Sequence, residues 1–236
     1  MLENFIRGDI VNHPLASLSP TDFSLLEPHL EAVDLPVRKQ LETHNRRIDH
    51  VYFIDHGIAS VVTRNSGKQG IEVGIIGREG LTGLAVIMET DRSPNDTFMQ
   101  MAGDGRRISA GKLRASMEQS ATLRRALLRY GHSFVIQTAH TALANGRNKL
   151  LERLARWLLM AHDRVDGDDI HLTHEFLSIM LGVRRTGVTV ALNQWARAGL
   201  VETKRGVITI LDRGGLEEIS NGSYGAPEAE LRRLFG

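Results

Sequence analysis

Residues 173–200 contain two short amphipathic segments separated by a glycine, and this pair constrains the fold more than any other stretch. The first segment places Phe176, Leu177 and Met180 on one side and stops before Gly182. In the second, apolar residues recur at i, i+3, i+4 and i+7, which is one face of an α-helix. These residues are Val188, Ala191, Leu192 and Trp195. The pattern predicts two helices joined by a tight turn at Gly182.

Two arginines, Arg184 and Arg185, stand at the expected start of the second helix, where the backbone dipole disfavours positive charge. Helix starts usually take Ser, Thr, Asp or Asn. In a helix-turn-helix, the N-terminal half of the second helix enters the DNA major groove. Phosphates and base edges would then offset the unfavourable dipole. We therefore expect the helix at about 184–197 to read DNA. Its polar face consists of Arg185, Thr186, Thr189 and Asn193.

A basic hairpin is expected after this helix. The stretch VETKRGVITILD has two short alternating runs around Lys204-Arg205-Gly206, the pattern of a β-hairpin with a basic tip. Between Val183 and Arg213 there are six Lys or Arg against two acidic residues, whereas the whole chain has a net charge of only +1. The positive charge is therefore local. We expect contacts to the DNA backbone from Thr173, His174, Arg184, Lys204 and Arg205.

The rest of the chain changes pattern twice. From about Val33 to Ile108 it consists of short β-branched and aromatic runs divided by Gly-rich turns, which is typical of an antiparallel barrel or jelly roll. A helical pattern follows, with a long helix at about 121–144. Asn145-Gly146 interrupts it and is the expected hinge. We expect a sensor domain over residues 1–145 and a winged helix-turn-helix domain with a C-terminal tail over residues 146–236.

The long helix has a broad stripe of apolar and small residues with seven-residue recurrences, which suits packing against another helix. Two interpretations are open: packing against a second copy of the chain, or packing on the barrel. We expect a homodimer, with a seam formed by Leu127, Leu128, Gly131, Phe134, Val135, Thr138 and Ala142.

Composition excludes several classes of site. The chain has no cysteine, so it has no disulfide framework, thiolate zinc site or cysteine-ligated iron–sulfur cluster. GIIGREGLTGL lacks the G-x-G-x-x-G spacing, and His132 and His140 are too far apart along a helix to share an ion without a symmetry mate. We expect no catalytic residues, no enzyme activity and no metal site. Without a secretory signal or a membrane-spanning apolar run, a cytoplasmic protein is expected.

The stretch ERLARWLLMAHDRVDGDDIHLTHEFLSIMLGVRRTGVTVAL resembles the Crp/Fnr superfamily of bacterial transcription regulators, and in particular a subgroup without a well-established effector. The resemblance covers nearly the whole chain. It implies an α+β fold with an N-terminal cupin-like antiparallel β-barrel of the cyclic-nucleotide-binding type, a long dimerisation helix and a C-terminal winged helix-turn-helix. It further implies a homodimer that binds a palindromic site in double-stranded DNA and contacts RNA polymerase, with no membrane partner.

The resemblance also suggests which residues contact bases. Cyclic-AMP receptors often carry Arg, Glu and a second Arg on the recognition helix. Here Arg185 fills the first position, Thr186 stands at the Glu and Val190 at the second Arg. A different base sequence should therefore be read, with base contacts from Arg185, Thr186, Thr189 and Val190.

The corresponding effector pocket departs from the cyclic-nucleotide pattern. Arg92-Ser93 is present but Pro94 follows it, and Thr82 occupies the position of the ribose-binding Glu, for which Glu79 could substitute only in a longer loop. The candidate pocket residues are Glu79, Thr82, Arg92 and Ser93. No cofactor is expected. A cyclic-nucleotide receptor that switches DNA binding remains one alternative, and a cupin-type enzyme with an accessory helix-turn-helix remains another.

Overall fold

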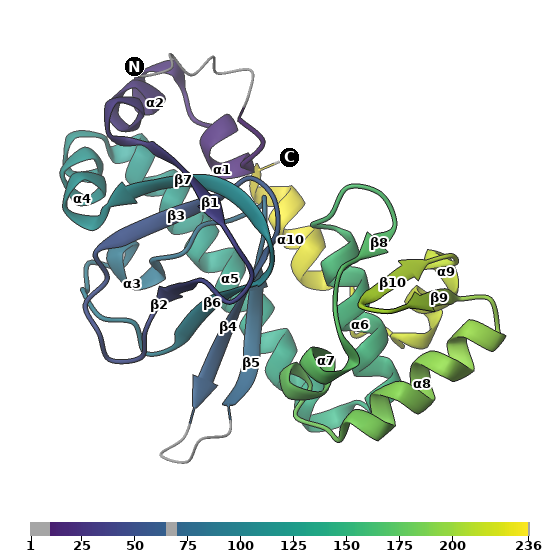
Figure 1. The fold of residues 1–236 in the computed structure, drawn as a ribbon. Coiled ribbons are helices and arrows are strands. Elements are labelled where there is room, and N and C mark those ends of the chain that lie inside the picture. The colour runs from purple at the N-terminus through teal and green to yellow at the C-terminus, as the bar shows by residue number, and fades with distance from the viewer. Residues whose placement is uncertain (1–9, 65–69, 236) are drawn as a thin grey trace. The chain divides into compact units, whose positions relative to one another are not determined.

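The computed structural model describes residues 10–64 and 70–235 (Figure 1). Its internal contacts divide it into two compact units. The first comprises residues up to Ala59, Ile76–His132 and the C-terminal residues from Arg233. The second comprises Ser60–Ile75 and Ser133–Arg232. The division cuts through two strands and two helices, and the domain boundary expected near Asn145 stays a prediction.

The first unit contains short antiparallel strands, as the sequence predicts for residues 33–108. Its strands are β1 (Glu31–Leu35), β2 (Gln40–Glu42), β3 (His50–Ile54), the start of β4 (Ile58–Arg64), β6 (Asp96–Met101) and β7 (Gly103–Ser109). One sheet has the order β1-β7-β3, and a second contains β2-β6-β4. Within the described residues the sheets are not closed into a barrel by hydrogen bonds, so the architecture is a pair of open sheets.

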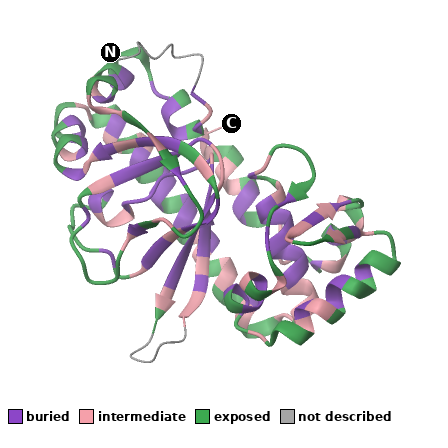
Figure 2. Cartoon of the chain, in the orientation of Figure 1, coloured by how far each residue is buried: buried purple, intermediate pink, exposed green. Residues whose placement is uncertain are grey.

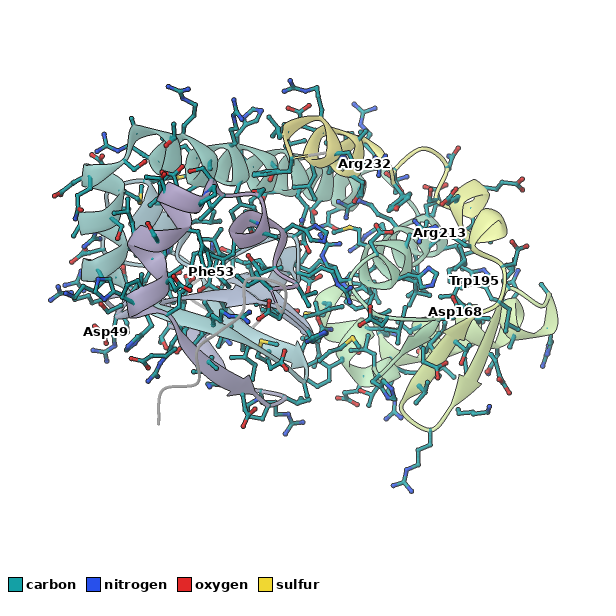
Figure 3. All side chains as sticks on the ribbon, turned by 90° about the horizontal axis from the view of Figure 1, so that it is seen from above. Asp49, Phe53, Asp168, Trp195, Arg213 and Arg232 are labelled. Atoms are coloured by element: carbon teal, nitrogen blue, oxygen red, sulfur yellow. The ribbon has the colours of Figure 1, made fainter. Side chains whose placement is uncertain are left out.

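Short helices complete the first unit. They are α1 (His13–Ala16), α2 (Pro20–Leu26), the 3-10 turn η2 (Glu27–His29), α3 (Leu84–Ile87) and α4 (Ala110–Gln119). The side chain of Ser19 caps α2 by accepting a hydrogen bond from the Asp22 backbone at 3.1 Å. The core combines residues of strands, helices and a connecting segment, among them Phe53, Leu81 and Leu113, all fully buried. Figure 2 shows buried residues in both the strands and the helices. Figure 3 shows Phe53 in the interior of this unit.

The long helix α5 spans Ala121–Arg147 and enters both units. It continues past the predicted end at Ala144, so Asn145 and Gly146 lie inside the helix and the expected interruption there is wrong. The break comes at Asn148 and Lys149, before α6 (Leu150–His162). Asn148 donates a side-chain hydrogen bond to Glu152 at 2.7 Å, and the Lys149 backbone donates to the same carboxylate at 3.0 Å. This carboxylate stabilises the start of α6, which explains why the chain turns there.

The second unit contains the rest of β4, most of β5 (Gly70–Ile76), which pairs with β4, the C-terminal part of α5, and everything from α6 to Arg232. Its remaining elements are β8 (Asp169–Ile170), α7 (His174–Met180), α8 (Arg185–Arg197), β9 (Val201–Lys204), β10 (Val207–Ile210), α9 (Arg213–Ile219) and most of α10 (Ala226–Phe235). The small sheet has the order β8-β10-β9. None of the helices in the described part of the chain is long and apolar enough to cross a membrane.

Candidate nucleic-acid interface

The predicted pair of helices is present as α7 and α8. Thr173 caps α7 by accepting a hydrogen bond from the Phe176 backbone at 3.2 Å. Gly182 has φ of +62°, a conformation that glycine adopts without the steric cost of a side chain. α8 then begins at Arg185, and its N-cap residue, Arg184, makes no side-chain capping bond. The start of this helix therefore lacks the local stabilisation that Ser or Asp would supply.

The two faces of α8 differ as the sequence predicts. One face is buried, with Val188, Ala191, Leu192 and Trp195 each at most 2% exposed. Figure 3 shows Trp195 within the second unit. The opposite face is open, and Val190 is 66% exposed. Arg184, Arg185, Thr186 and Asn193 are also exposed, and Thr189 is partly buried.

Two side chains at the start of α7 contact the open face of α8. Glu175 accepts a hydrogen bond from Arg185 at 3.4 Å, and both side chains are more than 60% exposed. His174 lies with its Nδ1 3.1 Å from the hydroxyl of Thr189. Burial, and secondly the charge of Arg185, lowers the pKa of His174. Sequence reasoning missed Glu175, because an acidic residue in the first turn of a helix is common and carries no specific signal.

The basic hairpin is also present. β9 and β10 pair with Lys204 opposite Val207, and Gly206 has φ of +76° in the turn. Lys204 and Arg205 are both exposed. The ammonium of Lys204 lies 3.1 Å from the carboxylate of Glu202, a surface pair that solvent screens. The tip therefore presents two cations to solvent.

The expected seam on α5 needs correction. Leu127 and Phe134 are 1% and 6% exposed, and Gly131 is buried, so these three residues pack within their own chain. Phe134 lies against Gly74 of β5. A Cβ atom added to Gly74 would lie 2.8 Å from the ring of Phe134. The periodicity could not separate two adjacent apolar faces of one helix. The exposed part of the stripe contains Leu128 and Val135, 43% and 53% exposed, and also Ala139 and Ala142.

Each of the four candidate effector residues forms a hydrogen bond with its own chain. Glu79 accepts from the Gly77 backbone at 3.2 Å, and Thr82 accepts from the Tyr52 backbone at 3.0 Å. Ser93 donates to the carbonyl of Asn95 at 2.8 Å. Arg92 donates to the carbonyl of Asn45 at 3.0 Å, and its side chain is 62% exposed.

Glu42 of β2 is a residue of this region that the sequence did not reveal. Its carboxylate accepts a hydrogen bond from the Gly83 backbone at 2.6 Å. Burial raises the pKa of Glu42, partly offset by hydrogen bonds from Ser93, Gly83 and Thr97. The carboxylate of Glu42 therefore already accepts hydrogen bonds from the donors around Ser93. Glu42 lies 41 residues from Gly83, so no local pattern could have found it.

Comparisons with known proteins agree with this geometry. Residues 152–219 match the family model of the Crp-like helix-turn-helix domain. FixK2 from Bradyrhizobium japonicum is similar in structure with a TM-score of 0.69 and 15% identity, covering 80% of this chain and 96% of that chain. A CRP family transcriptional regulator from Thermus thermophilus has a TM-score of 0.68 and 16% identity, covering 82% of this chain and 99% of that chain.

A Crp/Fnr family protein from Eubacterium rectale has a TM-score of 0.67 and 20% identity, covering 88% of this chain and 97% of that chain. No curated protein matches the sequence. The matched domain contains α7, α8 and the basic hairpin, and the structural likenesses extend over both units. The chain therefore carries a Crp-like helix-turn-helix domain on the fold of the Crp/Fnr family of transcription regulators.

Proposed function

We propose that the chain is a homodimeric transcription regulator that reads a palindromic operator with α8. The open face of α8 is the observation that supports this most directly. Two exposed arginines and the lack of a side-chain cap make the start of this helix less stable, because positive charge is unfavourable at a helix N-terminus. The phosphates of a nucleic acid would supply negative charge that offsets this effect. The buried face of α8 packs against the rest of the second unit and so fixes the orientation of the helix.

The two kinds of DNA contact follow from residue chemistry. Arg185 matches the O6 and N7 acceptors of guanine with its forked donors, while Thr186, Thr189 and the exposed Val190 offer methyl groups to thymine. The remaining candidates carry charge or short polar donors and would position the protein on phosphates. They are Thr173, His174, Arg184, Lys204 and Arg205.

The dimer is supported by the exposed stripe on α5. Leu128, Val135 and Ala142 recur every seven residues, and Ala139 lies on the same face. A large apolar stripe of this kind is typical of a protein–protein contact. A two-fold dimer would present two copies of α8 to two half-sites, which is why the operator should be palindromic. RNA polymerase is the further partner that this type of regulator implies.

Selection of binding sites from random DNA tests the proposal. We expect an inverted repeat with half-sites about one helical turn apart. A selected site without two-fold symmetry, or no enrichment at all, would contradict the proposed function.

Val135→Glu tests the dimer, because a charge on the stripe should give monomers in light scattering. Arg147→Glu is the matched control, since it changes charge on the same helix about a third of a turn away from the stripe. A Val135→Glu variant that still runs as a dimer would rule out this seam.

A further inference from the structure

Glu72 of β5 is a buried carboxylate that connects the β4–β5 hairpin to the DNA-binding domain. It is 6% exposed. One oxygen, Oε2, accepts a hydrogen bond from the hydroxyl of Ser60 on β4 at 2.5 Å. The other, Oε1, accepts from the indole Nε1 of Trp157 on α6 at 2.6 Å. Trp157 lies within the matched helix-turn-helix domain, and all three residues belong to the second compact unit.

No cation in the described part of the chain forms a direct ion pair with Glu72. Arg156 and Arg164 act on it only through longer-range charge, and Glu228 acts on Arg156 in turn. The Nε of Arg156 donates to the carbonyl of Ser223 at 3.0 Å, whereas its Nη2 is buried with no hydrogen-bond partner among the described residues. A buried carboxylate without a direct counterion is costly to ionise.

A small cavity lies beside these groups, with room for about one water molecule. Glu72 and Gly74 line it from β5, and Trp157 lines it from α6. Two further arginines, Arg153 and Arg156, face it from α6, while α5 and α7 contribute uncharged residues. These uncharged residues are Thr141, Ala144, Asn145 and Met180, and the lining is completed by Leu181, which follows α7, and Met160 of α6. The cavity is therefore polar on the side of Glu72. A change in the charge of Glu72 would alter the hydration of the cavity.

Burial raises the pKa of Glu72 to about 7, with hydrogen bonds from Ser60 and Trp157 and the charges of Arg156 and Arg164 acting in the opposite direction. The partners also indicate which oxygen carries the proton. An indole N–H can only donate, so it requires an unprotonated Oε1. A hydroxyl can donate or accept, so Ser60 tolerates a proton on Oε2.

We propose that Ser60, Glu72 and Trp157 form a proton-dependent latch, which holds the β4–β5 hairpin to α6 when Glu72 is protonated and loosens when Glu72 ionises. The ionised carboxylate draws water into the adjacent cavity, which weakens packing between the hairpin and α6. A carboxyl whose pKa is higher in the folded than in the unfolded chain stabilises the folded arrangement most at low pH. The contribution is complete below the ordinary value of 4.5 and is lost as pH rises through about 7.

Because α6 packs against α8, the latch also bears on DNA binding. This consequence rests on the proposed function, whereas the proton site itself does not. We expect operator affinity to change between about pH 6 and pH 8, over the range in which Glu72 titrates.

The indole N–H resonances of the protein test the latch without DNA. The chain has two tryptophans, so the ¹H–¹⁵N spectrum has two indole signals, which Trp195→Phe assigns. The Trp157 signal should shift with a midpoint near pH 7, and Glu72→Gln should remove the transition. A Trp157 signal that does not titrate between pH 6 and 8, or that titrates equally in Glu72→Gln, overturns the proposal.

Ser60→Ala supplies a second variant if Glu72→Gln fails to fold. Loss of a hydroxyl that donates to the carboxylate should move the Trp157 midpoint to higher pH. An unchanged or lower midpoint counts against the assignment. His174→Gln is the matched control, because it removes a titrating group that contacts α8 and should leave the Trp157 midpoint in place.

Operator affinity, measured from pH 6 to pH 8, tests the coupling. The pH dependence of the native chain should be reduced in Glu72→Gln, and equal pH dependence in the two proteins overturns the coupling. A chain that binds no DNA at any pH would refute the proposed function, while the indole titration would still decide whether the latch exists.

Discussion

The open face of α8 and the residues around Ser93 are two polar regions that differ in where their hydrogen-bonding groups are directed. At the start of α8, the side chain of Arg184 makes no capping bond, and among the described residues Arg185 has one ion-pair partner, the solvent-exposed Glu175 at 3.4 Å. In the first unit, Thr82, Ser93 and Glu42 all bond to groups of their own chain. One region presents polar groups to a partner, and the other uses them internally.

This difference separates recognition from packing. A surface that binds DNA must keep donors available, so its residues add little to the stability of the free protein. A buried hydroxyl or carboxylate that is already paired contributes to stability and has little capacity left for a ligand. The comparison therefore predicts that substitutions on α8 change DNA binding, whereas substitutions around Ser93 change stability.

Arg185→Ala should have the largest effect. We expect a loss of about 1–3 kcal/mol in operator binding and a flattened preference at one base position of each half-site, because the guanidinium fork is lost. Titration against operator and scrambled DNA measures both quantities. Arg197→Ala, in the last turn of α8, is the control and should change little. An equal loss of affinity for operator and scrambled DNA would show that Arg185 contacts phosphate and not a base.

Thr82→Val should lower the free energy of unfolding by about 1–2 kcal/mol, because the buried backbone N–H of Tyr52 loses its acceptor. Urea unfolding measures this effect. Operator affinity of the folded fraction should stay unchanged. A stable variant with weakened DNA binding would reverse the comparison between the two regions.

Lys204→Ala should weaken binding to every DNA sequence alike, by less than about 1 kcal/mol, and reduce the salt slope by about 1 per subunit. The reason is that an ammonium on the hairpin tip meets phosphate alone. Titrations at several salt concentrations measure the slope. Neutralising the partner of Lys204 with Glu202→Gln is the control, and it should not reduce the slope. Loss of base preference in Lys204→Ala would show that the hairpin reads sequence.

Arg92→Ala should have the smallest effect, with stability and operator binding both near those of the native chain. We also expect no saturable cyclic-AMP binding below the millimolar range, because the carboxylate of Glu42 already accepts the hydrogen bond from the Gly83 backbone. A millimolar dissociation constant corresponds to a binding free energy of about −4 kcal/mol. Calorimetric titration measures this directly. A micromolar dissociation constant that Arg92→Ala removes would instead support a cyclic-nucleotide receptor.

Local periodicity was sufficient for much of the DNA-binding domain. The faces of α8, the turn at Gly182 and the basic hairpin involve residues that are close in sequence. The same reasoning failed on α5, where Phe134 and Val135 are neighbours in an apolar stripe but differ in exposure, 6% against 53%. Phe134 is the one that packs within its own chain, because it lies against Gly74 of β5. Gly74 is not part of the helix, so the periodicity of the helix could not reveal this contact.

The two helices around Gly182, the paired arginines, the basic hairpin and the succession of strands and helices could all be predicted from the order of the residues. These features follow from spacings of a few residues, which backbone geometry converts directly into faces and turns. The hydrogen bond from Gly83 to Glu42 and the one from Trp157 to Glu72 span 41 and 85 residues, and they became visible in the folded chain. The ionisation of a buried carboxylate depends on the groups that folding brings around it, and sequence spacing contains no information about those groups.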